Sequence, residues 1–433
     1  MCCNIPAGFT LEYLYFNGGI FYLRVGLLVI MLKTMNTSSG IGAKEFTVLV
    51  AMLMSIVAIT IDALLPALGI IGTDLQAASE NHTQLLISLI FLGMAIGQVV
   101  CGPMSDAFGR KPVLFSGFAL YLVGTLTCYF APTFEWLMAG RLIQGLGVAG
   151  PYISSVSLVR DMFKGAQMAR LMSLVMMIFM LVPAIAPALG QGILMLWSWQ
   201  AIFVLYFVYA LFVLVWIALR LKETLPKERR IPFTAKGFFE GFKEVVSNRI
   251  TVGYTLCSGL FFGAFIGYLN SSRQIFQVQF DQGEMFIAYF GGLSLVLGFS
   301  SMVNSRIVEK FGTKLISFYA ILTIAVLSLV FLALHWVVDI RLWMFVIYAS
   351  ALFFCFGFLF GNVNAMAMEP MGHVAGIASA VIGASSSILS MTIGTLIGQM
   401  YNNTLIPIAA GFFVLCLLAL MIMFWVEKGR IHS

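Results

Sequence analysis

Two charged residues stand inside long apolar runs of this sequence, where a charge is costly. Asp62 lies within Ile59–Pro66, and Arg141 lies in the run that begins near Glu135. Burial favours the neutral form of a carboxyl group, whereas a nearby cation favours its charged form. An acid held between these two influences can take up and release a proton, and a charge inside a membrane segment marks a functional site by default. The alternative is a static Asp62–Arg141 pair that holds two helices together.

A second charged group fills the short gap between two apolar runs. Its members are Gly102, Asp106, Gly109, Arg110 and Lys111. Loops on the cytoplasmic face of a membrane carry basic residues, but that rule explains neither the acid nor the two glycines. We interpret the segment as a loop at the membrane surface that clamps two helices.

Proline and small residues gather in a third apolar run. Pro183 and Pro187 each remove a backbone hydrogen bond and bend a membrane helix. The small residues around them, including Gly190, allow close packing against a partner helix. An ordinary kinked helix would show the same pattern.

Polar residues in the middle of apolar runs are candidates for contacts with a small-molecule substrate, because ligand cavities are mostly apolar with a few polar groups. The candidates are Gln98, Tyr152, Tyr254, Asn362 and Asn364. Each could equally form a hydrogen bond between helices. The 25 Met, 39 Phe and 14 Tyr residues suit an adaptable site, although lipid-facing helices use the same residue types.

Membrane-spanning helices must position these residues. The chain of 433 residues is 61% hydrophobic and 10% charged, whereas a soluble domain carries about 25% charged residues. A helix of about 20 apolar residues crosses a bilayer, and the sequence contains twelve such runs. They lie near 46–70, 84–104, 112–133, 135–159, 171–195, 199–219, 250–272, 285–305, 315–337, 342–366, 374–400 and 404–426. We therefore predict an all-α integral membrane protein.

Basic residues indicate the orientation of these spans, because cytoplasmic loops carry the excess of Lys and Arg. With the first span leaving the cytoplasm, twenty of the 24 Lys and Arg residues fall in inner segments, and only Arg273 and Arg341 fall in outer ones. Both termini are therefore expected in the cytoplasm. The net charge of +6 reflects these loops, so no nucleic-acid partner is expected.

The spans divide the chain into two sets of six. We expect a leader at 1–45, a first bundle at 46–219, a cytoplasmic linker at 220–249, a second bundle at 250–426 and a cytoplasmic tail at 427–433. The leader has three interpretations: a signal peptide, a partial helix, or a polar segment that starts at Met35. The linker has an apolar helical face that predicts an amphipathic helix on the inner leaflet. That face contains Phe238, Phe239, Phe242, Val245 and Val246.

The two sets of six carry an internal repeat, which is typical of transporters. The dipeptide Phe108–Gly109 recurs 203 residues later as Phe311–Gly312. The second copy is degenerate, because two of its matched positions change type. The other matched pairs are Gly102 with Ser305, Asp106 with Glu309, Arg110 with Thr313, and Lys111 with Lys314.

The sequence resembles the major facilitator superfamily of secondary transporters over residues 46–426. Gly102–Lys111 is similar to the loop between helices 2 and 3 of that family, and Arg141–Gly147 is similar to its helix 4 motif. Pro183–Gly192 is similar to the helix 5 motif of its antiporters. Together with Asp62 and the following Leu65–Leu68, these motifs resemble the drug:proton antiporter branch and its Bcr/CflA subfamily.

This resemblance implies two six-helix bundles that rock about a central cavity and expose it alternately to each side. It implies a monomer in the bacterial inner membrane, with protons and a drug-like small molecule as partners and no cofactor. In the family Arg141 is linked to proton coupling. Asp106 and Arg110 form a cytoplasmic gate that reaches helix ends across the bundle interface and stabilises the outward-open state. Candidate gate partners are Arg160, Asp161 and Glu369.

Other functions fit parts of the pattern. Export of a natural metabolite, such as an amino acid, sugar or siderophore, would use the same gate and proton site. Uptake by symport is disfavoured by the two prolines of the fifth span. An enzyme is not expected, because the sequence has no nucleotide loop, no His-Glu-x-x-His motif and no clustered metal ligands. A receptor or scaffold would not need a charge at Asp62.

Overall fold

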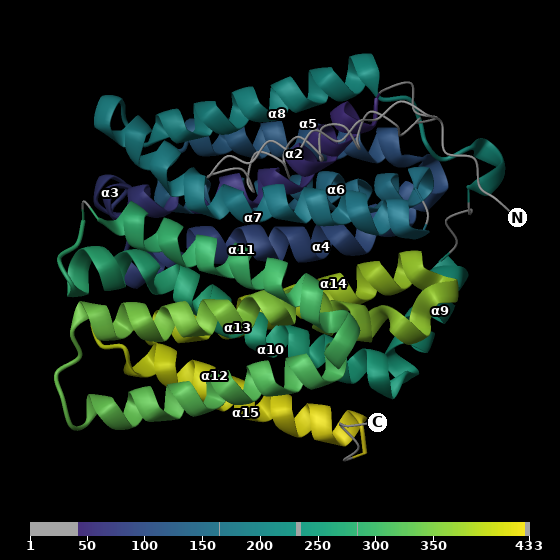
Figure 1. The fold of residues 1–433 in the computed structure, drawn as a ribbon. Coiled ribbons are helices and arrows are strands. Elements are labelled where there is room, and N and C mark those ends of the chain that lie inside the picture. Colours follow the sequence, from purple (N-terminus) through teal and green to yellow (C-terminus); the bar gives the residue numbers. More distant parts are fainter. Residues whose placement is uncertain (1–41, 164, 231–234, 284, 429–433) are drawn as a thin grey trace, which may run out of the picture.

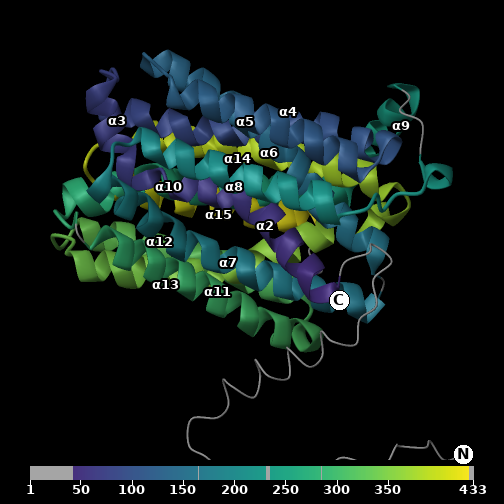
Figure 2. The ribbon, with the colours of Figure 1, turned by 90° about the horizontal axis from the view of Figure 1, so that it is seen from above.

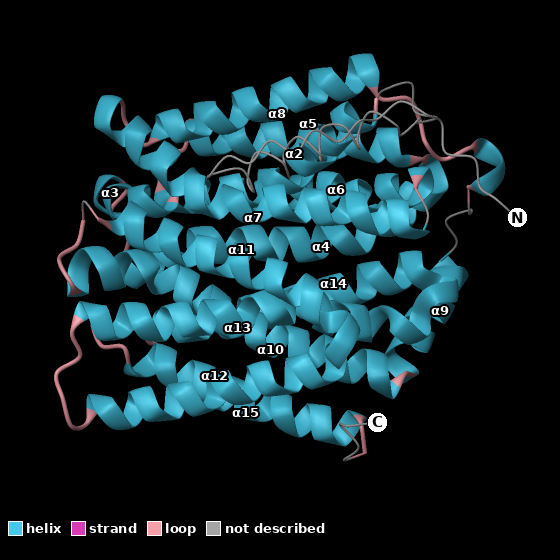
Figure 3. Ribbon diagram, in the orientation of Figure 1, coloured by secondary structure: helices cyan, strands magenta, loops and turns pink. Residues whose placement is uncertain are grey.

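The computed structural model describes residues 42–163, 165–230, 235–283 and 285–428, and these residues form helices without a strand (Figure 1, Figure 3). The first half contains α2 (Ala43–Asp62), α3 (Leu68–Asp74), α4 (Leu85–Phe108), α5 (Arg110–Tyr129), α6 (Phe134–Met162), α7 (Gly165–Leu196) and α8 (Gln200–Arg220). The second half contains α10 (Arg249–Arg273), α11 (Phe286–Phe311), α12 (Thr313–His335), α13 (Leu342–Met368), α14 (Ala375–Gln399) and α15 (Ile406–Val426). Between them lies the linker helix α9 (Ala235–Ser247).

The predicted spans are all helical. Eleven helices of the described residues are long and apolar enough to cross a membrane. A twelfth helix, α7, has 32 residues and contains the apolar stretch Leu181–Leu196. The long helices run side by side in both views (Figure 1, Figure 2). The prediction of an all-α membrane fold with two six-helix bundles is confirmed. The predicted leader at 1–45 lies almost entirely outside the described residues.

The first span is broken directly after Asp62. The α-helix α2 ends at this residue, a 3₁₀ turn, η2 (Leu65–Ala67), follows, and α3 continues to the end of the span. Proline explains the break, because Pro66 has no N–H to give to the carbonyl group of Asp62 four residues earlier. The candidate proton carrier therefore sits at a joint in its helix.

The ten residues from Gly102 to Lys111 are not the surface loop that the sequence analysis predicts. Helix α4 continues to Phe108 and α5 begins at Arg110, so Gly109 alone separates the two helices. Its φ angle of 106° lies in the left-handed region, which glycine adopts without strain. Gly312 makes the same joint between α11 and α12 with φ 76°. The internal repeat of the sequence is therefore also a repeat of the backbone conformation at these two joints.

The two halves fill the space between their helices with different residue types. In the first half α5 and α6 approach to backbone contact. A Cβ on Gly117 would lie 2.8 Å from the carbonyl oxygen of Gly147 and 2.9 Å from Pro151. In the second half, phenylalanine rings from α10 and α13 form a cluster with tilted and edge-to-face contacts. The members of this cluster are Phe261, Phe262, Phe265, Phe353, Phe356 and Phe360.

The linker helix α9 lies against α14, since a Cβ on Gly241 would touch Ile377. Val245 of the predicted apolar face is buried, whereas Phe239, Phe242 and Val246 are exposed. The side chain of Phe238 lies outside the described residues. One apolar strip of α9 therefore packs on the second bundle, and a neighbouring strip stays open, as expected for a helix at a membrane surface.

Candidate functional site

Asp62 is a buried carboxylate with an exposed fraction of 4%. Among the residues that the structure describes, none forms an ion pair or a hydrogen bond with its side chain. The hydroxyl groups of Tyr206 and Tyr268 lie within electrostatic range of it. Tyr268 belongs to α10 of the second bundle. Its hydroxyl is buried without a partner among the described residues.

Arg141 is fully buried, and it binds backbone and amide oxygens rather than an acid. Its Nε donates to the Leu86 carbonyl at 2.9 Å, and its Nη2 donates to the Thr60 carbonyl at 3.0 Å. Its Nη1 donates to Gln144 Oε1 at 2.9 Å. The predicted static pair with Asp62 is therefore absent in this conformation, although the Thr60 carbonyl places Arg141 only two residues from Asp62 along α2.

A hydrogen-bond chain extends from this arginine through the first bundle. Gln144 Nε2 donates to Thr125 Oγ1 on α5 at 2.9 Å, and Thr60 Oγ1 bonds the Tyr121 hydroxyl at 2.7 Å. The Tyr206 hydroxyl of α8 donates to the same Thr60 carbonyl that Arg141 uses. The network links α2, α4, α5, α6 and α8. It fixes the helix turn that precedes Asp62.

The proline-containing helix α7 packs against the joint in the first span. A Cβ on Gly190 would overlap the carbonyl oxygen of Ala63, the residue after Asp62. On its other side, the Ala184 carbonyl would lie 3.2 Å from a Cβ on Gly291 of α11. Pro183 and Pro187 both lie inside this helix. The predicted helix 5 motif therefore lies between the Asp62 joint and the second bundle and contacts both.

The gate residues form a charge network at the end of the molecule that carries Gly109, here called the Gly109 end. Arg110 is buried, and its guanidinium donates to Asp106 at 2.6 Å and to Asp161 at 2.7 Å. Glu223 of the linker accepts the backbone N–H groups of Arg110 and Lys111, each at 3.0 Å. A carboxylate in this position caps the N-terminus of α5 and complements its dipole.

Within the described part of the chain, these gate residues form no ion pair across the bundle interface. Asp161 belongs to the first bundle, as do Asp106 and Arg110. The crossing contact is instead between Asp106 and Gly376 in the first turn of α14, where a Cβ would overlap the carboxylate. Negative charge is favourable near a helix N-terminus. Gly102 adds a second close contact, because its Cβ would lie 2.8 Å from Ala380 of α14.

Three of the five predicted substrate contacts lie together. Gln98, Tyr152 and Asn364 line one cavity of about 140 Å³ near the Gly109 end, between α4, α6, α13 and α14. Asp106 and Arg160 line it as well. The carbonyl oxygen Oε1 of Gln98 is buried and has no hydrogen-bond partner among the described residues, so the cavity offers an open acceptor.

The other two predicted contacts lie elsewhere. The Tyr254 hydroxyl donates to Glu427 Oε1 at 2.7 Å, beyond the end of α15. Asn362 exchanges two hydrogen bonds with Asn304 of α11, at 3.0 and 3.1 Å. Both are contacts between helices of the second bundle, which is the alternative that membrane packing offers for polar side chains.

Uncharged amides join the two bundles at the opposite end, here called the Asn81 end, and the sequence analysis did not identify them. Gln84 Nε2 donates to Gln274 Oε1 at 2.6 Å, and Gln274 Nε2 donates to Asn81 Oδ1 at 2.8 Å. Gln399 Nε2 donates to the Asn81 carbonyl at 2.6 Å. Asn81 in turn donates to the backbone carbonyls of Gln399 and Tyr401. The sequence signal that could have identified these contacts is that the amide side chains lie at the ends of predicted spans.

Comparison with known proteins identifies the family. The sequence profile of the Major Facilitator Superfamily matches residues 15–395. The chain belongs to the major facilitator superfamily. It is therefore a multi-pass membrane protein of a transporter family, and not an enzyme.

Curated relatives of this superfamily member span nearly all of it. It is 30% identical over 392 residues to an uncharacterized transporter, YdgK, of Bacillus subtilis, covering 88% of the chain and 95% of the relative. It is 30% identical over 355 residues to a bicyclomycin resistance protein homolog of Haemophilus influenzae, covering 80% and 87%. It is 28% identical over 384 residues to the multidrug resistance protein MdtL of Escherichia coli, covering 86% and 92%. These relatives confirm the resemblance to the drug:proton antiporter branch.

Solved structures share its fold. A D-xylose-proton symporter matches with a TM-score of 0.70 at 15% identity, over 90% of this chain and 98% of the other. A partially occluded inward-open form of the xylose transporter XylE of Escherichia coli matches with a TM-score of 0.67 at 14% identity, over 88% and 97%. At this identity the likeness supports the fold alone.

Proposed function

We propose that this protein is a proton-coupled antiporter that exports drug-like small molecules by alternating access. It lies in the bacterial inner membrane as a monomer with both termini in the cytoplasm. The domain limits are those of the sequence analysis, with the two bundles rocking about the cavity between them. The names of two relatives, which refer to bicyclomycin resistance and multidrug resistance, support export of drugs.

The observation that carries the proposal is the buried, unpaired carboxyl group of Asp62. A charge in this position costs at least about 2.5 kcal/mol at the membrane centre, so the neutral form is favoured when no cation faces it. Arg141 lies nearby but is committed to three oxygen acceptors in this conformation. A change in the α2 joint that brings Arg141 and Asp62 together would favour release of the proton.

Helix α7 supports antiport, because it contacts both the joint after Asp62 and the second bundle. Movement of α11 against α7 would therefore change the surroundings of Asp62. In this proposal Pro183, Pro187 and Gly190 transmit the movement. The substrate occupies the cavity lined by Gln98, Tyr152 and Asn364.

Substrate-driven proton movement tests the coupling directly. Inside-out vesicles are acidified, and a pH-sensitive dye reports proton release after addition of bicyclomycin or ethidium. We expect release with the natural sequence and none with Asp62→Asn, provided that the variant melts at the same temperature. Asp339→Asn, at an exposed acid, is the matched control and should release protons normally. Uphill export by a folded Asp62→Asn variant would rule out this carrier.

We also propose that the network of Asp106, Arg110 and Lys111 is the cytoplasmic gate. Asp106→Ala removes the carboxylate that meets the first turn of α14. The resting population should then shift toward the inward-open state. A thiol-reactive probe reads this shift at a cysteine placed at Ser157, which lines the cavity. Equal labelling of the Asp106→Ala variant and of the protein with the natural Asp106 would contradict the proposed role of this network as a cytoplasmic gate.

A further inference from the structure

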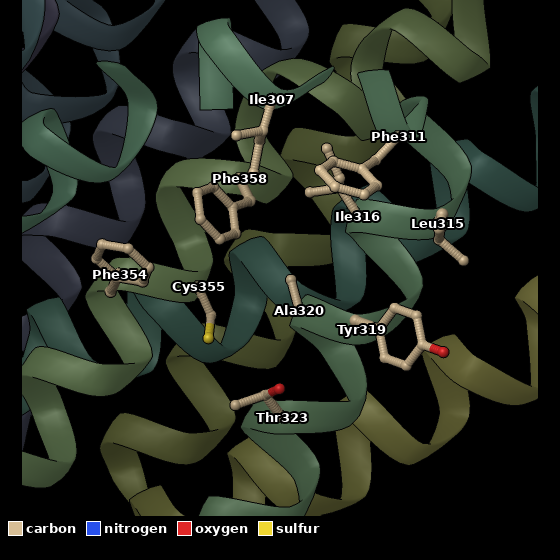
Figure 4. A pocket seen from close by; sticks show the side chains of 10 residues that line it. All are labelled: Ile307, Phe311, Leu315, Ile316, Tyr319, Ala320, Thr323, Phe354, Cys355 and Phe358. Atoms are coloured by element: carbon tan, nitrogen blue, oxygen red, sulfur yellow. The ribbon is translucent and has the colours of Figure 1, made fainter. Parts of the chain in front are cut away.

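An apolar groove of about 460 Å³ lies between α11, α12 and α13, away from the cavity of the proposed transport site. Figure 4 shows its lining, in which Phe311, Phe354 and Phe358 surround a floor that includes Ala320 and Cys355. The groove is open to the outside of the bundle. Tyr319 at its rim is 51% exposed and Phe311 is 49% exposed. In a membrane protein such a rim faces lipid.

The groove lies at a position where the two repeated halves carry different residues. Gly117 of α5 packs against the backbone of α6, and the matching residue 203 positions later is Ala320. Ala320 of α12 lines the groove. The groove therefore lies where the second half departs from the repeat at this position.

Positive charge stands beside the mouth of the groove. Lys310 and Arg306 are exposed on the last turns of α11, next to the lining residues Ile307 and Phe311. The Lys310 ammonium group lies 5.2 Å from the centre of the Phe311 ring. Glu309, an acid on the same helix, lies two residues from both Ile307 and Phe311 and projects from the opposite side of α11, because a helix turns by about 100° per residue.

We propose that this groove binds an anionic phospholipid, with one acyl chain between α11 and α12 and the phosphate group at Lys310 and Arg306. The apolar lining accepts the chain through van der Waals packing, which drives association between apolar groups within a membrane. Basic pockets between membrane helices attract anionic head groups. Lys314 is less available, since its ammonium group pairs with Glu427 at 2.9 Å. The bound lipid would fill the space that close helix packing fills in the first half.

Lipid quenching of a tryptophan at the rim tests the proposal in the full chain. A Tyr319→Trp variant is placed in phosphatidylcholine vesicles with either brominated phosphatidylglycerol or brominated phosphatidylcholine. The signal of the natural chain is subtracted as background. Brominated phosphatidylglycerol should quench at lower content, with a preference of about fivefold for each of the two cations. Equal quenching by the two lipids would overturn the proposal.

Four further variants separate the parts of the site. Adding Lys310→Gln and Arg306→Gln should bring the preference to one, whereas the matched pair Lys222→Gln and Lys227→Gln, exposed in the linker, should leave it unchanged. Filling the groove with Ala320→Phe, or with Thr323→Phe at the exposed rim, should also abolish the preference. Persistence of the preference without the two cations would contradict the phosphate contact. Relief of quenching by tetraphenylphosphonium would assign the groove to a transport substrate instead.

Discussion

The first and second halves of this molecule share a topology but differ in what holds them together. In the first half, glycines bring α5 and α6 into backbone contact, and buried polar groups centred on Arg110 and Arg141 tie the helices to one another. In the second half, a cluster of phenylalanine rings fills the space between α10 and α13. The matching joints at Gly109 and Gly312 show that the backbone plan is common to both.

The two halves therefore differ in their proposed roles as well as in how they are packed. The charges that we propose as proton carrier and gate lie in the first half, where directional hydrogen bonds surround Arg110 and Arg141. Aromatic packing is less directional, so the second half can present a surface that shifts against the first. Contacts between the halves include neutral amides at the Asn81 end and the carboxylate of Asp106 at the Gly109 end.

The largest expected effect comes from giving the first half the residue that the second half has at its joint. Arg110→Thr leaves Asp106 and Asp161 facing each other without their shared cation. Removal of one partner from a buried ion pair costs about 3–5 kcal/mol. We expect a large loss of folded protein, measured by size-exclusion chromatography and thermal melting in detergent. A yield and melting temperature equal to those of the natural sequence would show that the network adds nothing to the first half.

A smaller effect should follow from adding one methyl group between α5 and α6. Gly117→Ala places a Cβ within 2.8 Å of the Gly147 carbonyl, and overpacking of this kind costs about 1–3 kcal/mol. The sign is informative, because helix propensity alone predicts a gain of about 1 kcal/mol. Gly361→Ala, on α13 where the new methyl group meets open space, is the control and should raise the melting temperature. A higher melting temperature in both variants would show that the close contact between α5 and α6 does not oppose the added methyl group.

The amide contacts test whether the unlike halves move as units. Gln274→Ala removes two hydrogen bonds across the Asn81 end, each contributing about 1 kcal/mol or about fivefold in population. Spin labels at Glu135 and Arg341, in a cysteine-free background, should report a longer distance between the halves. Gln279→Ala breaks a bond to Tyr401 within the second half and should leave the distance unchanged. The same distance in both variants would mean that these amides do not hold the end closed.

The smallest effect is expected from the reverse exchange at the second joint. Thr313→Arg creates the spacing of Asp106 and Arg110, with Glu309 four residues earlier. Because Glu309 is exposed, the new pair should contribute no more than about 1 kcal/mol. Thermal melting checks this. A gain as large as the loss in Arg110→Thr would show that burial does not distinguish the two joints.

Sequence reasoning predicted what periodicity and local spacing encode. Apolar run length gave the twelve spans, whereas the Asp106–Arg110 ion pair was not predicted, because the segment was interpreted as a loop and it is helical. Three features depended on which helices become neighbours and were not predicted: the carbonyl acceptors of Arg141, the capping carboxylate of Glu223, and the amides around Gln274. A polar residue at a span end looks the same in the sequence whether it meets water or another helix.

At each of the two joints a single residue, Gly109 or Gly312, connects two long helices. Two long helices on either side of one residue must travel as a pair, so any tilt of α4 is passed to α5 and any tilt of α11 to α12. Extra residues at either glycine would uncouple such a pair. An affinity tag or reporter domain therefore belongs in the exposed stretch from Pro226 to Glu228, where added length leaves the helix pairs intact.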